Sequence, residues 1–169
     1  MAVLANVISL IGCGIMVAIG FVKNKDRILL VQCIQFVFQG AAHLMLGAVS
    51  GFVCCVVSII RNLVFRAGKS GFWLKLGFIL LQIVLTLSAG SFSPIELLPI
   101  LATIVFTWFL DVKNPVHFKL VLICAQLMWL VYDLYYGNIV AALFDVMTVC
   151  STIGGIWLIL KNKQRKAPL

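Results

Sequence analysis

The sequence predicts an all-α integral membrane protein with seven transmembrane helices, because of its composition, its apolar runs and the positions of its basic residues. Of its 169 residues, 63% are hydrophobic and only 11% are charged, and the mean hydropathy is +1.17. Soluble domains average about half apolar and about a quarter charged residues. The apolar residues form runs of membrane-spanning length separated by short charged gaps, which is typical of a chain whose solvent is lipid.

Seven apolar runs define the predicted spans. Because lipid offers no hydrogen bonds to an open backbone, each span should be an α-helix. No basic segment precedes the first apolar run, so we expect no cleaved signal peptide. The predicted spans cover residues 3–22, 28–46, 51–65, 72–89, 95–110, 118–135 and 139–160.

The basic residues predict the orientation of the chain. Lys and Arg lie in or beside the first, third and fifth gaps and in the C-terminal tail, whereas the second, fourth and sixth gaps contain none. Cytoplasmic loops are enriched in Lys and Arg, so we expect the C-terminus in the cytoplasm and, with an odd number of spans, the N-terminus outside. The net charge of +8 then reflects topology and contact with anionic lipid, and it requires no nucleic-acid partner.

An internal repeat is predicted at an offset of 90 residues. This overlay places spans one to three on spans five to seven without a gap and leaves span four as a connector. The turn residues agree, since Asn24 falls on Asn114 and Gly47 on Gly137. An odd connector between three-helix units makes the two copies parallel, related by an axis along the membrane normal. The predicted units are a first repeat (residues 1–69), a linker helix (70–91), a second repeat (92–161) and a basic cytoplasmic tail (162–169).

Polar side chains form stripes at helical spacing on six of the seven predicted spans. Such residues are costly in lipid, so they should face other helices or a cavity. We expect a polar chamber between the two three-helix units, with the connector packed outside it. The candidate substrate-binding residues are Gln39, His43, Arg61, Asn62, Trp129, Asp133, Asp145 and Thr148.

Each candidate also has a simpler structural interpretation. Gln and Thr stripes can join helices through hydrogen bonds. Arg61 lies near enough to the cytoplasmic end to extend its guanidinium there, His43 can be a packing residue, and Asp133 can be solvated at the outer end. Asp145 lies about 10 Å along the helix axis from Asn138. We therefore favour a functional role for Asp145, as a counter-ion to Arg61, a ligand group or a proton site.

The sequence contains no pattern that indicates an enzyme or a metal site. All six cysteines fall within spans, without metal-ligand spacing or a disulfide framework, and no phosphate loop or nucleophile elbow is present. His43 and Asp133 are the only acid–base combination, and the overlay puts them in opposite units. We therefore expect no enzymatic activity, no cofactor and no bound metal.

Several motifs resemble the bacterial inner-membrane YgjV family, and together they extend over nearly the whole chain. They are the segment 95–100 (Ile-Glu-Leu-Leu-Pro-Ile) with Thr107 and Trp108 downstream, the segment 43–47, Arg61, and the segment 137–148. The resemblance implies a multi-pass protein of the bacterial inner membrane. More remotely, the plan of three, one and three helices resembles the SWEET and SemiSWEET sugar transporters, other PQ-loop proteins and the PnuC-type vitamin transporters.

The remote resemblance implies a substrate site between the two units. In the sugar transporters an aromatic residue on a unit's second helix and an Asn on its third face the substrate, and Trp129 and Asp145 resemble that pair. We therefore expect a transporter of a small polar solute (a sugar, nucleoside or vitamin-like molecule) that works by alternating access. An Asp in the chamber also suits a cationic solute or proton coupling. The alternative is a non-transporting membrane scaffold or accessory protein with the same fold, and either function is compatible with a homo-oligomer.

Overall fold

The structure is a computed structural model that describes residues 2–19, 21–69, 71–88 and 93–165, and it contains seven α-helices and no strand within these ranges. The all-α prediction is therefore confirmed. The ends of the predicted linker unit (70 and 89–91), the first residue of the second repeat (92) and the end of the predicted basic tail (166–169) lie outside the described residues. The helices are α1 (Ala2–Ile19), α2 (Lys25–Met45), α3 (Val49–Arg66), α4 (Phe72–Ser88), α5 (Leu97–Trp108), α6 (Pro115–Tyr135) and α7 (Ile139–Arg165), with a 3₁₀ turn, η1 (Pro94–Glu96), before α5.

Helices α2 and α6 begin and end in the same way. Asn24 and Asn114 each accept hydrogen bonds from backbone N–H groups in the first turn, so each caps its helix. At the other end, Gly47 and Gly137 have φ angles of 73° and 71°, a left-handed conformation that glycine adopts without steric cost. Both helices are 21 residues long. The chain therefore reverses at equivalent points 90 residues apart.

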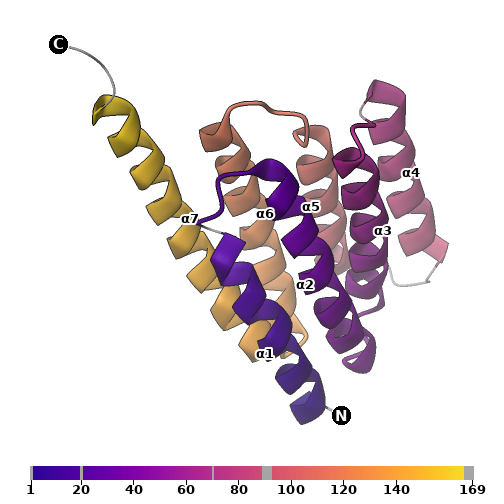
Figure 1. Ribbon diagram of the computed structural model, residues 1–169. Helices are drawn as coiled ribbons and strands as arrows, with labels where there is room; N and C mark the ends of the chain where they lie inside the picture. The colour runs from indigo at the N-terminus through magenta and orange to yellow at the C-terminus, as the bar shows by residue number, and fades with distance from the viewer. Residues whose placement is uncertain (1, 20, 70, 89–92, 166–169) are drawn as a thin grey trace.

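Six helices form a closed ring, and α4 lies outside it (Figure 1). Around the ring, α1 contacts α2, α2 contacts α3, α3 contacts α5, α5 contacts α6, α6 contacts α7, and α7 returns to α1. Helix α4 packs against α3 and α5. Consecutive helices run in opposite directions, so α1 begins at the end of the bundle opposite to the end where α7 finishes (Figure 1). We call α1–α3 the first triplet and α5–α7 the second triplet.

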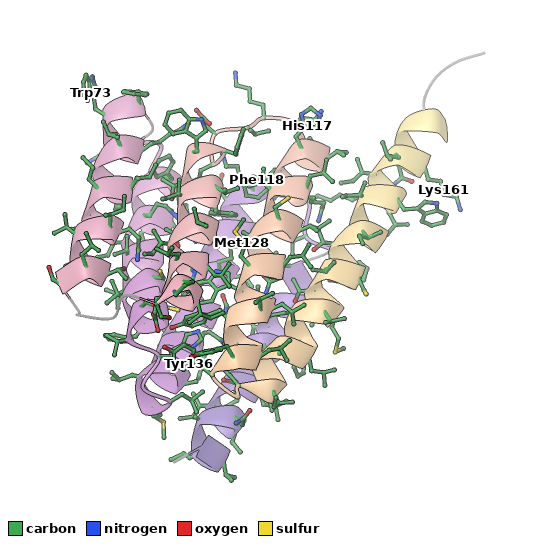
Figure 2. The ribbon with its side chains drawn as sticks, turned by 180° about the vertical axis from the view of Figure 1, so that it is seen from behind. Trp73, His117, Phe118, Met128, Tyr136 and Lys161 are labelled. Atoms are coloured by element: carbon green, nitrogen blue, oxygen red, sulfur yellow. The ribbon has the colours of Figure 1, made fainter. Side chains whose placement is uncertain are left out.

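The two ends of the bundle differ in charge. Lys161 and the start of α6 at His117 lie at the same end as Trp73, whereas Tyr136 lies at the opposite end (Figure 2). The connections between α1 and α2, α3 and α4, and α5 and α6 all lie at the first end and carry basic residues. The turns at residues 46–48 and 136–138, at the opposite end, carry no charge. We call these the basic end and the uncharged end.

The outward face of the bundle is suited to lipid. Four helices are long and apolar enough to cross a membrane: α2, α3, α6, and residues Ile139–Asn162 of α7. Large apolar side chains such as Val37 and Leu143 are exposed on this face. Trp73, Trp108 and Trp157 are exposed near the basic end, as expected of aromatic residues at a membrane interface. The apolar segments Val3–Val17 of α1, Phe72–Ser88 (α4) and Pro94–Trp108 (η1 and α5) are shorter, so their crossing of the membrane stays a prediction.

The apolar core fills the ring toward the basic end. Ile19, Ile28, Leu110 and Phe118 lie in or next to the basic-end connections, and each side chain is 3% exposed or less. They belong to one cluster that also takes in side chains from α3 and α4. This packing closes the ring at the basic end, so the buried polar side chains collect in the middle and toward the uncharged end.

Candidate functional site

A polar cavity of about 40 Å³ lies inside the ring, and side chains from all six ring helices line it. About 10–15 Å³ of such space holds one water molecule, so this cavity holds a few. Its amide, hydroxyl and carboxyl lining consists of Gln32, Gln35, Gln39, Thr103, Gln126, Asp133 and Asp145. The side-chain oxygen of Gln35 is buried without a hydrogen-bond partner among the described residues, which marks a position for water or a ligand donor.

Two carboxyl groups meet in the cavity wall. Asp133 on α6 and Asp145 on α7 both line the cavity and are 1% and 3% exposed, and Asp145 Oδ2 has no hydrogen-bond donor among the described residues. Gln39 Nε2 and Asn138 Nδ2 each donate to Asp133 over 3.3 Å. Gln126 Nε2 donates to Asp145 Oδ1. Amide donors from both triplets therefore hold the pair, and the bond from Gln39 joins one triplet to the other.

His43 lies beside this pair within an aromatic cluster near the uncharged end. Its Nδ1 is 3.7 Å from Asp133 Oδ1, and its ring stacks on Trp129 with centroids 5.4 Å apart. The ring of Tyr132 meets His43 edge-on at 5.7 Å. The hydroxyl of Tyr132 is 2.9 Å from Ser50 Oγ, which ties α6 to α3. These rings cover the cavity at the uncharged end, and the side chain of His43 is fully buried.

Arg61 on α3 anchors a second polar network. Its guanidinium donates to Thr107 Oγ1 over 2.9 Å and to Asn62 Oδ1 through two nitrogens, at 3.1 and 3.0 Å. It also lies 4.8 Å from the centre of the Phe106 ring. Asn62 Nδ2 in turn donates over 3.2 Å to Gln32 Oε1, and Gln32 lines the cavity. Arg61 is thus connected to the cavity through two amide side chains.

The structure separates the sequence-predicted residues into three groups. Gln39, Trp129, Asp133 and Asp145 line the cavity; Arg61, Asn62 and His43 contact residues that line it; and Thr148 is buried outside its lining, with no hydrogen-bond partner for its hydroxyl among the described residues.

Two of the simpler interpretations, and one of the functional roles predicted for Asp145, are wrong for this structure. Arg61 is 1% exposed and its guanidinium is held by Thr107 and Asn62, so it does not extend to the surface at the basic end. Asp133 is buried and not solvated. In the described part of the chain no carboxylate pairs with Arg61, so Asp145 is not its counter-ion. His43 and Asp133, placed in opposite units by the overlay, nevertheless lie side by side.

The contacts of Tyr132 and Tyr136 were not predicted from the sequence. Tyr132 bonds to Ser50 and accepts a hydrogen bond from the Gly51 backbone N–H over 3.0 Å, and Tyr136 donates its hydroxyl proton to Glu96 Oε1. A signal was present, because residues 129, 132 and 136 are aromatic and their spacing of three and four residues places them on one face of α6. A search for polar stripes alone passes over tyrosine, whose ring packs like an apolar residue.

Comparison with known proteins identifies the family. The sequence model of one family, described as a bacterial inner membrane protein (Imp-YgjV), matches residues 3–163. No curated protein and no solved structure matches the chain, so the remote resemblance to SWEET and PnuC transporters stays a prediction. The several apolar helices able to span a bilayer agree with an inner-membrane location. The chain belongs to the YgjV family of bacterial inner membrane proteins.

Proposed function

We propose that this protein moves a small polar solute across the bacterial inner membrane by alternating access between the first and second triplets. In this proposal all seven helices cross the membrane, α4 connects two parallel three-helix repeats, and the basic end faces the cytoplasm. The solute occupies the central cavity once the triplets move apart. Trp129 stacks against it, and Asp145, Gln39 and Asn62 supply polar contacts.

The composition of the cavity wall carries this proposal. Of the fifteen residues that line the cavity, twelve form six pairs separated by 90 positions. A parallel repeat arranges equivalent residues around its axis, so such pairs are expected where a cavity lies on that axis, and transporter substrates bind at the interface between repeats. The pairs are Met16 and Phe106, Gln32 and Leu122, Gln35 and Ala125, Phe36 and Gln126, Gln39 and Trp129, and Cys55 and Asp145.

The helix contacts support the same arrangement. The triplets meet at two places, α1 against α7 and α3 against α5. An offset of 90 residues converts the first contact into the second, because α5 corresponds to α1 and α7 to α3. Helix α4 contacts α3 and α5 from outside the ring. It therefore connects the triplets without separating them, which suits rocking of one triplet against the other.

Contacts between the triplets lie at both ends of the cavity, and such rocking would break them. At the uncharged end, hydrogen bonds from Gln39 to Asp133 and from Gly51 to Tyr132 join the triplets. At the basic end, Ile28 and Phe118 from opposite triplets belong to one apolar cluster. A cavity that holds a few waters is far smaller than ordinary ligand sites, which measure about 300–1,000 Å³. In this proposal the structure represents an occluded state, and its cavity expands when either end opens.

Labelling of Cys55 tests alternating access without knowledge of the solute. A variant that retains only Cys55 is placed in sealed vesicles of known orientation and exposed to a water-soluble thiol reagent from either side. Cys55 lines the cavity and is 1% exposed, so it should be labelled from both sides if each end opens in turn. The matched control retains only Cys150, which lies on the exposed face of α7 and should stay unlabelled in lipid. Labelling of Cys55 from one side or from neither would contradict the proposal.

A ligand screen then identifies the solute class. A solute that binds only the folded protein raises its melting temperature, by an amount equivalent to about 2.7 kcal/mol at a hundredfold excess over Kd. Sugars, nucleosides, vitamins and amines are screened against the purified protein. A genuine ligand should stabilise the wild type and not Asp145→Asn or Trp129→Ala. Equal stabilisation of the wild type and both variants would place binding elsewhere.

The hydrogen bonds across the ring favour a second candidate, a static scaffold or accessory protein. Arg61 bonds to Thr107 across the triplet interface, Gln39 bonds to Asp133, and Gln82 on α4 bonds to Cys54 on α3. Such bonds hold membrane helices together in proteins that do not move. The Cys55 experiment separates the two functions, because a scaffold should leave Cys55 unlabelled from both sides.

A further inference from the structure

The buried carboxyl pair implies a bound proton. Asp133 and Asp145 line the same cavity, and Asp145 Oδ2 is buried there without a hydrogen-bond donor among the described residues. Both side chains are 3% exposed or less, and two neighbouring negative charges repel strongly in a medium of low dielectric constant. A protonated carboxyl can donate a hydrogen bond to an ionised one, whereas two ionised carboxylates only accept. The proximity and the burial of the two carboxyl groups therefore favour one shared proton.

The surrounding groups do not supply a compensating charge. Among the described residues, the titratable side chains that face the pair are Cys13 from α1, His43 from α2 and Cys55 from α3, and Tyr132 from α6 contacts His43. Of these only His43 can become a cation near neutral pH. Its Nδ1 lies 3.7 Å from Asp133, beyond hydrogen-bond distance, and its ring is enclosed by aromatic side chains. The remaining contacts to the pair are neutral amides.

We propose that Asp133 and Asp145 form a proton-binding site that holds one shared proton, and that exchange of this proton couples solute movement to the proton gradient across the inner membrane. The coupling rests on the proposed function, whereas the site does not. Gln39 joins the pair to the first triplet through its bond to Asp133, so a change in the protonation of the pair acts directly on the contact between triplets. Intramembrane acids with this surrounding mark proton pathways in pumps and transporters.

The exchange step involves only an O–H bond. When one end of the cavity opens, water reaches the pair, a hydronium ion transfers a proton to a carboxylate oxygen, and the pair becomes fully protonated and neutral. When the other end opens, the proton returns to water and the pair regains one negative charge. The loss of charge weakens the hydrogen bond that Gln39 donates to Asp133, because bonds to a charged acceptor are roughly twice as strong as neutral ones.

Infrared spectroscopy tests the site in the absence of any solute. The purified protein in lipid at neutral pH should show the carbonyl band of a buried protonated carboxyl, shifted when H₂O is replaced by D₂O. The double variant Asp133→Asn with Asp145→Asn should lose this band. Glu96→Gln is the matched control, because Glu96 is also buried and bonded to Tyr136, and this variant should keep the band. Absence of the band from the wild type, or its presence in the double variant, would overturn the proton site.

The single variants test whether the proton is shared. In Asp133→Asn or Asp145→Asn the remaining carboxyl loses its acidic partner, so the band should shift or vanish in each. A band that stays unchanged in one single variant would assign the proton to the other residue alone and would overturn sharing. Asn has nearly the shape of Asp, so both variants should fold, and circular dichroism in detergent confirms that they do.

The pH dependence of Cys55 labelling tests the coupling. The ratio of labelling rates between the wild type and the double variant is measured over acidic to alkaline buffer, so that the intrinsic reactivity of the thiol cancels. This ratio should change by up to about tenfold per pH unit, because the labelled states differ by one bound proton. A ratio that does not change with pH would overturn the coupling. If Cys55 is never labelled, the proposed function and the coupling fail together, and the infrared result still decides the proton site.

Discussion

The first and second triplets place different chemistry at positions 90 residues apart, which the predicted repeat makes equivalent. At this offset His43 overlays Asp133 and Cys55 overlays Asp145, so the buried acids of the cavity wall lie in the second triplet and the neighbouring base lies in the first. Arg61, a buried base near the cavity, corresponds to Ser151. The two backbones share the caps, the glycine turns and the length of their second helices, α2 and α6. The helices of the two triplets therefore surround the cavity in similar ways, and the side chains that differ between them make its two sides chemically different.

Exchanging His43 and Asp133 should have the largest effect on stability. His43→Asp places a third carboxyl against the pair with no cation to balance it, and an uncompensated buried charge costs about 3–5 kcal/mol. Adding Asp133→His restores one acid and one base in exchanged positions, and it should recover about 0.5–3 kcal/mol, the usual coupling energy of residues in contact. Unfolding of the purified variants in denaturing detergent measures both values. Additive effects in the double variant would show that the two positions are not coupled.

Replacing Arg61 by Lys should have the next largest effect. A lysine ammonium cannot reproduce the fork that binds Asn62 and Thr107 together, and hydrogen bonds to charged groups contribute about 1.5–3 kcal/mol each. We therefore expect Arg61→Lys to lower the free energy of unfolding by about this amount, as measured in the same assay. The exposed Arg66 one turn later is the matched control, since Arg66→Lys should change stability by less than about 0.5 kcal/mol. Equal effects at the two positions would mean that the Arg61 network contributes no stability.

Gly51 differs from its equivalent, Ala141, because an aromatic ring packs against it. A Cβ added at Gly51 would lie 2.9 Å from Tyr132 Cε1 and 3.0 Å from His43 Cγ. Gly51→Ala should therefore destabilise the protein by about 1–3 kcal/mol, the usual cost of overpacking. Gly77→Ala is the control, since no atom lies within 4 Å of the added Cβ and alanine favours the helix. A Gly51→Ala variant as stable as Gly77→Ala would show that the rings of Tyr132 and His43 shift to make room for the added methyl group at no measurable cost in stability.

The smallest expected effect on stability concerns an ion pair at the basic end, between α4 and the second triplet. Lys75 on α4 donates to Asp111 over 2.6 Å, whereas the first triplet has Phe21 at the position equivalent to Asp111. This hydrogen bond lowers the pKa of Asp111 below its usual value. A lowered carboxyl pKa contributes stability above the ordinary range of Asp, and this contribution is lost as the pH falls through the lowered value.

Asp111 is 55% exposed, so the contribution should stay below about 1 kcal/mol. Stability curves of the wild type and Asp111→Asn over pH should differ at neutral pH and converge in acid. A constant difference at all pH values would rule out this ionic contact as its source.

The helical class of the fold was predictable because lipid and helix geometry act locally. Apolar runs bounded by charges gave the seven helical segments, and the observed α2 and α6 begin within three residues of the predicted spans 28–46 and 118–135. Asn and Gly at the turns were equally readable, since capping depends on residues within one turn of the helix end. The crossing of the membrane by all seven helices and the parallel repeat remain predictions.

Less of the candidate site was predictable from the sequence. Helical spacing placed Gln39, Trp129, Asp133 and Asp145 on polar faces, and these residues line the cavity. It could not show that Asp133 contacts Asp145, because the two residues are twelve positions apart on different helices. Nor could it show that Arg61 bonds to Thr107, 46 positions away. Contacts of this kind depend on the rotation and tilt of whole helices, which residue spacing within one helix does not specify.

The sequence by itself determined that this chain is helical, apolar on its outer face, and polar along particular stripes, because each of these properties follows from local spacing and from the solvent around the helix. Only the tertiary structure decided that the stripes enclose a cavity, that two acids meet there, and that aromatic rings cover it. Those contacts join residues far apart in the chain, and their geometry is set by the packing of six helices at once.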